Sequence, residues 1–155
     1  SAMLGVTIVL SGAAYARNAV WKDGITLWED AVDKSPLDPM GHYNLGNAYR
    51  AAGLKAKAIE QYQFAIKLRP DNVEAYNNLG LVYESIALYD EAVKCYKRAL
   101  EIDPLIDKPH FNLGAIYLHR GMINDAHREL EKAIQLNPNH ARARLLLDRI
   151  LNTVK

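Results

Sequence analysis

Residues 73–104 read VEAYNNLGLVYESIALYDEAVKCYKRALEIDP, and this stretch decides the fold because its pattern occurs three times along the chain. The spacing from Gly46 to Gly80, and again from Gly80 to Gly114, is 34 residues. Further columns with the same period are Asn44, Asn78 and Asn112; Leu45, Leu79 and Leu113; Tyr49, Tyr83 and Tyr117; Ala58, Ala92 and Ala126; Ala65, Ala99 and Ala133; and Pro70, Pro104 and Pro138. So many positions in register indicate an internal structural repeat.

Each repeat has the pattern of two helices that pack against each other. Leu79, Gly80 and Tyr83 are spaced so that they share one face of a helix. Gly80 has no Cβ, so a second helix can approach closely at this point. Ala92 and Tyr96 lie four residues apart on that second helix, where the alanine admits the neighbour and the tyrosine fills the gap.

The turns between these helices also follow from the repeat. Gly53 and Gly121 mark a tight turn in the first and third units, and Ala87 replaces glycine in the middle unit. Pro104 ends the second helix, because the residue before a proline avoids helical geometry. The predicted first helices span 39–52, 73–86 and 107–120, and the predicted second helices span 55–68, 89–102 and 123–136.

This pattern resembles the tetratricopeptide repeat (TPR) family, whose signature combines the period of 34 residues with leucine, tyrosine, alanine and proline positions of this kind. The resemblance implies an all-α, right-handed superhelical solenoid of helix-turn-helix repeats. Complete repeats are expected at 39–72, 73–106 and 107–140. Residues 4–38 are interpreted as a degenerate first repeat, and residues 141–155 as a capping helix that covers the last apolar face.

The N-terminal sequence is apolar and has two open interpretations. Residues 1–3 are interpreted as an expression scar. Residues 4–16 carry no charge and are too few to span a membrane alone, so they are either core of the degenerate repeat or the end of a truncated span. The residues from Arg17 to Pro36 resemble the junction in multi-spanning membrane proteins with TPR tails, of the O-mannosyltransferase type and their prokaryotic counterparts. The apolar helix also predicts homo-oligomers, because exposed apolar patches favour association.

Composition and motifs argue against several functions. The chain has 19 basic and 18 acidic side chains, and this balance makes nucleic acid an unexpected partner. Phosphate loops, His-Glu-x-x-His, Cys-x-x-Cys and Gly-x-Ser-x-Gly motifs are absent from the sequence. Cys95 has no disulfide partner, and His127 with Glu131 form a solvated helical pair rather than a metal site. We therefore expect no catalytic residue, no metal, no cofactor and no enzyme activity.

A binding surface follows from the repeat, because the first helices of stacked pairs line the concave side of a solenoid. Asn44, Asn78 and Asn112 would form a ladder of amides that pair with the backbone of an extended peptide. The predicted groove residues are Tyr43, Asn44, Asn47, Arg50, Asn77, Asn78, Leu81, Glu84, Lys108, Phe111, Asn112, His119, Arg142 and Arg149. Ala115, Leu118 and Leu145 are predicted to face the same groove.

The same surface partly resembles the carboxylate clamp of chaperone-binding family members. Asn47, Asn78 and Lys108 match three clamp positions, but Tyr43 and Asn112 replace the remaining cations. Tight capture of a terminal carboxylate is therefore not expected from this set alone.

The sequence as a whole predicts a protein-interaction scaffold that binds a protein or peptide. Lys108, Arg142 and Arg149, with His119 nearby, predict that the partner is acidic near the capping helix. Two other functions stay open at this point. One is an accessory, substrate-presenting domain of a membrane glycosyltransferase, and the other is a self-assembly module.

Overall fold

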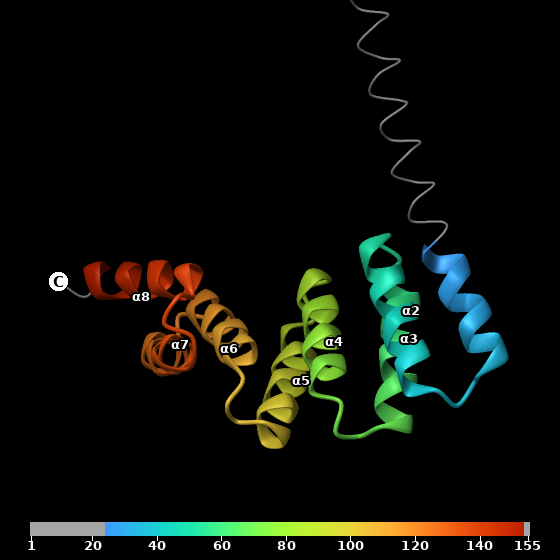
Figure 1. The fold of residues 1–155 in the computed structure, drawn as a ribbon. Coiled ribbons are helices and arrows are strands. Elements are labelled where there is room, and N and C mark those ends of the chain that lie inside the picture. The colour runs from blue at the N-terminus through green and yellow to red at the C-terminus, as the bar shows by residue number, and fades with distance from the viewer. Residues whose placement is uncertain (1–23, 154–155) are drawn as a thin grey trace, which may run out of the picture. The chain divides into compact units, whose positions relative to one another are not determined.

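The computed structural model describes residues 24–153, and the regular elements in this range are all α-helices (Figure 1). Residues 24–34 are helical. The helices that follow are α2 (Pro39–Ala51), α3 (Lys55–Leu68), α4 (Val73–Ser85), α5 (Tyr89–Ile102), α6 (Asp107–His119), α7 (Ile123–Leu136) and α8 (Ala141–Thr153). The predicted all-α class is confirmed. The second helices have the predicted bounds, and each first helix ends one residue earlier than predicted.

The chain divides after Pro70 into two compact units. In the first unit α2 packs against α3. In the second unit α4 packs against α5 and α6 against α7, while α5 also contacts α6 and α8 contacts α7 (Figure 1). The second unit thus contains two helical hairpins and a final single helix.

Each hairpin is held by a large buried side chain that lies against a glycine. A Cβ on Gly80 would lie 2.5 Å from Cε1 of the Tyr96 ring, which is closer than carbon atoms can approach. The corresponding Cβ on Gly46 would meet the Tyr62 ring at 2.8 Å, and the one on Gly114 would meet Cγ of Leu130 at 2.8 Å. The alanines that flank these large side chains are fully buried. Close helix approach at the glycine column, predicted from the sequence, is therefore confirmed.

The three hairpin turns have the same hydrogen bonds. In the middle turn the Leu88 N–H donates to the Tyr83 carbonyl at 2.9 Å, and the Ala87 N–H donates to the Glu84 carbonyl at 2.9 Å. These two bonds define a Schellman motif, which requires a residue with positive φ. Gly53 and Gly121 supply φ values of 76° and 72° in the outer turns, but Ala87 adopts 61° without the freedom of glycine.

The last helix covers the apolar end of the α6/α7 hairpin. Ala143 and Ile150 of α8 are buried in one cluster with Phe111, Leu130 and Ala133. The amphipathic face of α8 is therefore used for packing, and its remaining sides are available to solvent and to ligands.

The predictions made for residues 1–16, namely the expression scar, the truncated span and the oligomerising apolar helix, lie outside the described residues. Within residues 24–153 none of the helices is both long enough and apolar enough to cross a membrane.

Candidate functional site

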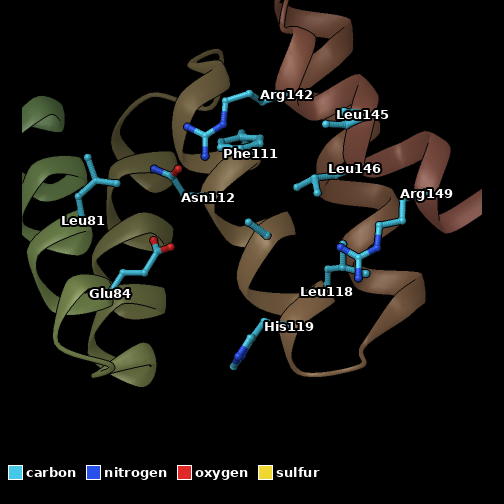
Figure 2. A pocket seen from close by; sticks show the side chains of 11 residues that line it. Leu81, Glu84, Phe111, Asn112, Leu118, His119, Arg142, Leu145, Leu146 and Arg149 are labelled. Atoms are coloured by element: carbon cyan, nitrogen blue, oxygen red, sulfur yellow. The ribbon is translucent and has the colours of Figure 1, made fainter.

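The second unit contains a hollow of about 590 Å³ between α4, α6 and α8 (Figure 2). Each of these helices contributes one face, so the hollow lies on the side formed by the first helices of the hairpins and by the capping helix. Its lining residues are Leu81, Glu84, Phe111, Asn112, Ala115, Leu118, His119, Arg142, Leu145, Leu146 and Arg149.

The floor and the α8 wall of the hollow are mostly apolar. Leu81, Ala115 and Leu118 contribute from α4 and α6, and Leu145 and Leu146 contribute from α8. Leu145 remains 69% exposed, although leucine is an apolar residue. Leu146 was not among the predicted groove residues. Its spacing from the other α8 residues in the hollow, at i+4 after Arg142, would have placed it on the same face.

Cationic side chains gather at one end, around a smaller adjoining hollow of about 220 Å³. Lys108 and Arg142 line it together with His140, Phe111 and the side chains of Asn77 and Asn112. The Arg142 guanidinium lies 5.1 Å from the centre of the Phe111 ring, in cation–π geometry.

His140 belongs to this cationic end although the sequence analysis did not identify it. Its ring lies 4.5 Å from the Phe111 ring, centre to centre, and its Nδ1 accepts a hydrogen bond from the Ala143 N–H at 3.2 Å. His140 therefore caps α8 as well as lining the hollow. It precedes the helix, so the helical periodicity used to predict the groove could not include it.

The asparagines of the second unit bond to one another. Asn112 Nδ2 donates to Asn77 Oδ1 at 3.1 Å, and Asn77 Nδ2 donates to Asn78 Oδ1 at 3.4 Å. Asn112 is 8% exposed and lines both hollows, whereas Asn78 lines neither. A primary amide has two N–H donors and a carbonyl, so Asn112 keeps groups that can pair with a ligand.

Glu84 lines the opposite end of the hollow and is held by a buried tyrosine. The Tyr96 hydroxyl donates to Glu84 Oε2 at 2.9 Å. Burial, together with the charge of Glu84, raises the pKa of Tyr96, so the hydroxyl stays protonated and donates. Figure 2 shows Glu84 on the α4 wall and Arg149 on the α8 wall, with His119 at the end of α6 below both in this view.

The remaining predicted groove residues are on α2 in the first unit, which is described by itself. The Tyr62 hydroxyl donates to Asn47 Oδ1 at 2.7 Å, and Arg50 Nε donates to that hydroxyl at 3.3 Å. The Tyr43 ring lies 6.1 Å from the Tyr62 ring, and Asn44 is half-buried. Asn47 and Arg50 are therefore engaged by the hairpin's own tyrosine.

Cys95 and the pair of His127 and Glu131 are the groups that the sequence analysis considered for chemistry. Burial raises the pKa of the Cys95 thiol to about 12, so it is a poor nucleophile at neutral pH. His127 Nδ1 lies 3.4 Å from Glu131 Oε2, and the two residues form a partly exposed pair on one helix. Residues 24–153 contain no cluster of three His, Cys, Asp or Glu side chains that could hold a metal ion.

Helical hairpins of one repeated length, with a hollow along their first helices, define an α-helical repeat protein. Comparison with family models identifies the family. Models described as tetratricopeptide or TPR repeats match residues 11–63, 47–86 with 89–121, 73–104 and 108–140. The chain belongs to the tetratricopeptide repeat family.

Solved structures of similar fold include two kinds of TPR protein. A crystal structure of MamA has 27% identity and a TM-score of 0.73, with 84% of this chain and 77% of that chain covered. MamA from Desulfovibrio magneticus RS-1, residues 41 to the end, has 20% identity and a TM-score of 0.76, with 87% and 76% covered. The first TPR domain of Spaghetti (RPAP3), bound to the HSP90 peptide SRMEEVD, has 21% identity and a TM-score of 0.71, with 75% and 92% covered. A comparison with curated proteins found no match.

Proposed function

We propose that this protein is a non-catalytic interaction scaffold that binds an extended peptide segment of its partner in the hollow between α4, α6 and α8. The observation that carries the proposal is the exposed apolar surface inside this hollow, above all Leu145, which is 69% exposed. An apolar hollow with a few convergent polar groups is the usual form of a binding site.

The charges at the edge of the hollow indicate what kind of peptide fits. Lys108 and Arg142 are exposed and line the same end, and stacking on Phe111 limits the positions that the Arg142 side chain adopts. Two neighbouring cations favour a carboxylate, and the Nε2–H of His140 adds a further donor, because its Nδ1 already accepts from Ala143. The proposed segment is therefore acidic where it meets this end.

The peptide in the RPAP3 structure is acidic as well, which supports an acidic ligand for the same fold. The groups that would bind it here are different. Asn112 stands where the clamp resemblance expects a cation, and it is nearly buried and bonded to Asn77. The proposal therefore assigns the acidic side chains to Lys108 and Arg142 rather than to a complete carboxylate clamp.

A peptide selection with matched variants tests the proposal. Random 12-residue peptides are selected against the full chain, and their affinities are measured by fluorescence anisotropy. Leu145→Asp, inside the hollow, should weaken binding at least tenfold, since it places a charge on the apolar wall. Leu105→Asp is the control, because Leu105 is 72% exposed and lines neither hollow. Failure to select any peptide, or equal binding by both variants, would refute the proposed site.

A second pair of variants separates backbone from charge recognition. The double variant Lys108→Ala with Arg142→Ala should weaken acidic peptides more than neutral ones, and this difference should shrink at high salt because ions screen exposed charges. Asn112→Ala should weaken acidic and neutral peptides alike if the asparagine ladder contacts the peptide backbone, because Asn112 is the ladder residue that lines both hollows. If the double variant keeps the wild-type preference for acidic peptides, the assignment of Lys108 and Arg142 is wrong.

A further inference from the structure

The negative charge of Glu84 exceeds what packing requires. A buried tyrosine hydroxyl needs a hydrogen-bond acceptor, and a neutral amide is sufficient, because the Tyr62 hydroxyl donates to Asn47 in the first unit. In the α6/α7 hairpin Leu130 replaces the tyrosine, and the residue equivalent to Glu84 is the apolar Leu118. A carboxylate at residue 84 therefore satisfies Tyr96 but also brings a charge into the hollow that the fold does not need.

That charge is not neutralised within the described part of the chain. Glu84 forms no ion pair among residues 24–153, although Arg149 lines the same hollow. The Tyr96 hydroxyl occupies one carboxylate oxygen, and the side chain points into the hollow from the α4 wall (Figure 2). The hydrogen bond from Tyr96 already restricts the Glu84 side chain, so Glu84 would lose less rotamer entropy on binding a ligand.

Glu84 and the cationic end lie at different heights along the hollow. Glu84 and Leu118 are equivalent repeat positions, and Leu118 lies seven residues after Phe111 on α6. Along the axis of α6, the level of Leu118 is therefore about 10 Å from Phe111 and about 15 Å from Lys108. In an extended peptide, residues i and i+4 are about 13 Å apart and face the same side. Residue i+2, midway between them, faces that side as well.

We propose that Glu84 is the subsite for a basic side chain, so that the bound segment is bipolar, with an acidic and a basic residue four apart and an apolar residue midway. This inference rests on the proposed peptide-binding function. The acidic residue meets Lys108 and Arg142, the apolar residue lies on Leu81, Leu118 and Leu145, and the basic residue meets Glu84. The peptide direction is not fixed by these contacts, because the three side chains keep their spacing in either direction.

The probes are short labelled peptides with a single variable residue. The bipolar probes are Gly-Ser-Glu-Ser-Leu-Ser-Lys-Ser-Gly and its reverse sequence, and in the comparison probes the lysine is replaced by glutamate or by glutamine. The full chain should bind the better bipolar probe at least fivefold more tightly than its glutamate counterpart, with the glutamine counterpart in between. The preference should fall at high salt, because it depends on charge.

Glu84→Gln tests whether this preference depends on Glu84, and it keeps an acceptor for the hydrogen bond from the Tyr96 hydroxyl. The glutamine carbonyl can still accept the tyrosine hydroxyl, so the melting temperature should be unchanged. The variant should lose the preference for lysine over glutamine, and Glu84→Lys should reverse the preference between lysine and glutamate. Glu74→Gln is the control for net charge, because Glu74 is exposed on the same helix and lines neither hollow.

The outcomes distinguish this inference from the proposed function. If the selected library peptides bind with dependence on Leu145 but the probes show no preference for lysine, the scaffold function stands and the Glu84 subsite is refuted. If Glu74→Gln changes the preference as much as Glu84→Gln, the effect is one of net charge and the subsite is also refuted. If neither library peptides nor probes bind, both proposals fail.

Discussion

At the scale of single residues, one contact repeated in each hairpin determines how closely the two helices approach. Gly80 leaves a space that the flat ring of Tyr96 occupies, and this ring is fully buried. The Gly114 and Leu130 pair shows that a branched aliphatic side chain can occupy the same space. The requirement is therefore for a residue without Cβ on the first helix, whatever large side chain faces it.

Gly80→Ala should destabilise the protein for this reason. The new methyl group would overlap the Tyr96 ring, and overpacking of this kind costs about 1–3 kcal/mol. The higher helix propensity of alanine returns about 0.5–1 kcal/mol, so a net loss is expected in the free energy of unfolding measured with urea. Gly41→Ala is the control, since its Cβ would lie 3.4 Å from its nearest neighbours and should be tolerated. Equal stability of the two variants would mean that the glycine column does not limit helix approach.

The sequence was sufficient to predict this packing but not the hydrogen bonds beside it. The glycine, alanine and tyrosine columns recur with the period, so their positions follow from spacing alone. The bond from Tyr96 to Glu84 does not recur, because the residue equivalent to Glu84 is Arg50 in one repeat and Leu118 in another. A repeat signature contains no information about side chains that differ between repeats.

At the scale of elements, the hairpin turn is the part of the repeat with the strictest backbone requirement. All three turns have the same bonds from the residue after the turn to the tyrosine carbonyl, at 2.9 Å in each case. Glycine satisfies the positive φ of the outer turns, whereas Ala87 has φ of 61°. A left-handed conformation costs a residue with Cβ about 1–2 kcal/mol.

Ala87→Gly should therefore stabilise the protein. Relief of the left-handed strain exceeds the extra entropy that glycine gains in the unfolded chain, so we expect a net increase of about 0.5–1 kcal/mol. The check is the urea midpoint at an unchanged m-value. Gly53→Ala and Gly121→Ala are the reciprocal controls, and each should lose stability by about 1 kcal/mol. If Ala87→Gly lowers the midpoint, the turn does not carry the strain inferred from its φ value.

Element ends were predictable where the sequence has a clear stop signal. The second helices end before prolines or polar turns, and their predicted bounds agree with α3, α5 and α7. The first helices end in the Schellman turn, where the last residue before the left-handed position is a cap and not part of the helix. This explains why each of them is one residue shorter than the repeat pattern indicates.

At the scale of the molecule, the period predicted which helix faces line the hollow but not which residues share it. Twelve of the predicted residues, from Asn77 to Arg149, line the two adjoining hollows of the second unit. Asn78 does not, and the four residues on α2 belong to the other unit. Helix spacing gives the direction of a side chain, whereas a hollow also depends on the capping helix and on His140, which precedes it.

Three buried side chains that ionise at alkaline pH, one thiol and two tyrosine hydroxyls, should make the stability of the protein decrease as the pH rises. Burial raises the pKa of the Cys95 thiol from 9.0 to about 12 and that of the Tyr49 hydroxyl from 10.0 to about 12, and it raises the pKa of Tyr96 as well. Below about pH 8 these groups are protonated in both the folded and the unfolded chain, so they do not affect stability. Above their ordinary pKa values only the unfolded chain releases its protons, and unfolding becomes more favourable.

The free energy of unfolding, measured with urea in the presence of a reductant, should therefore be constant up to about pH 8.5 and decrease above it. A single cysteine contributes a slope of up to about 1.4 kcal/mol per pH unit. Cys95→Ala isolates the contribution of the thiol, because it should flatten the curve between about pH 8.5 and 9.5, where few tyrosines of the unfolded chain are ionised. The decrease above pH 10 should persist in that variant, since Tyr49 and Tyr96 remain buried. A wild-type curve that stays level to pH 11 would show that the folded chain admits water to these groups and ionises them as readily as the unfolded chain.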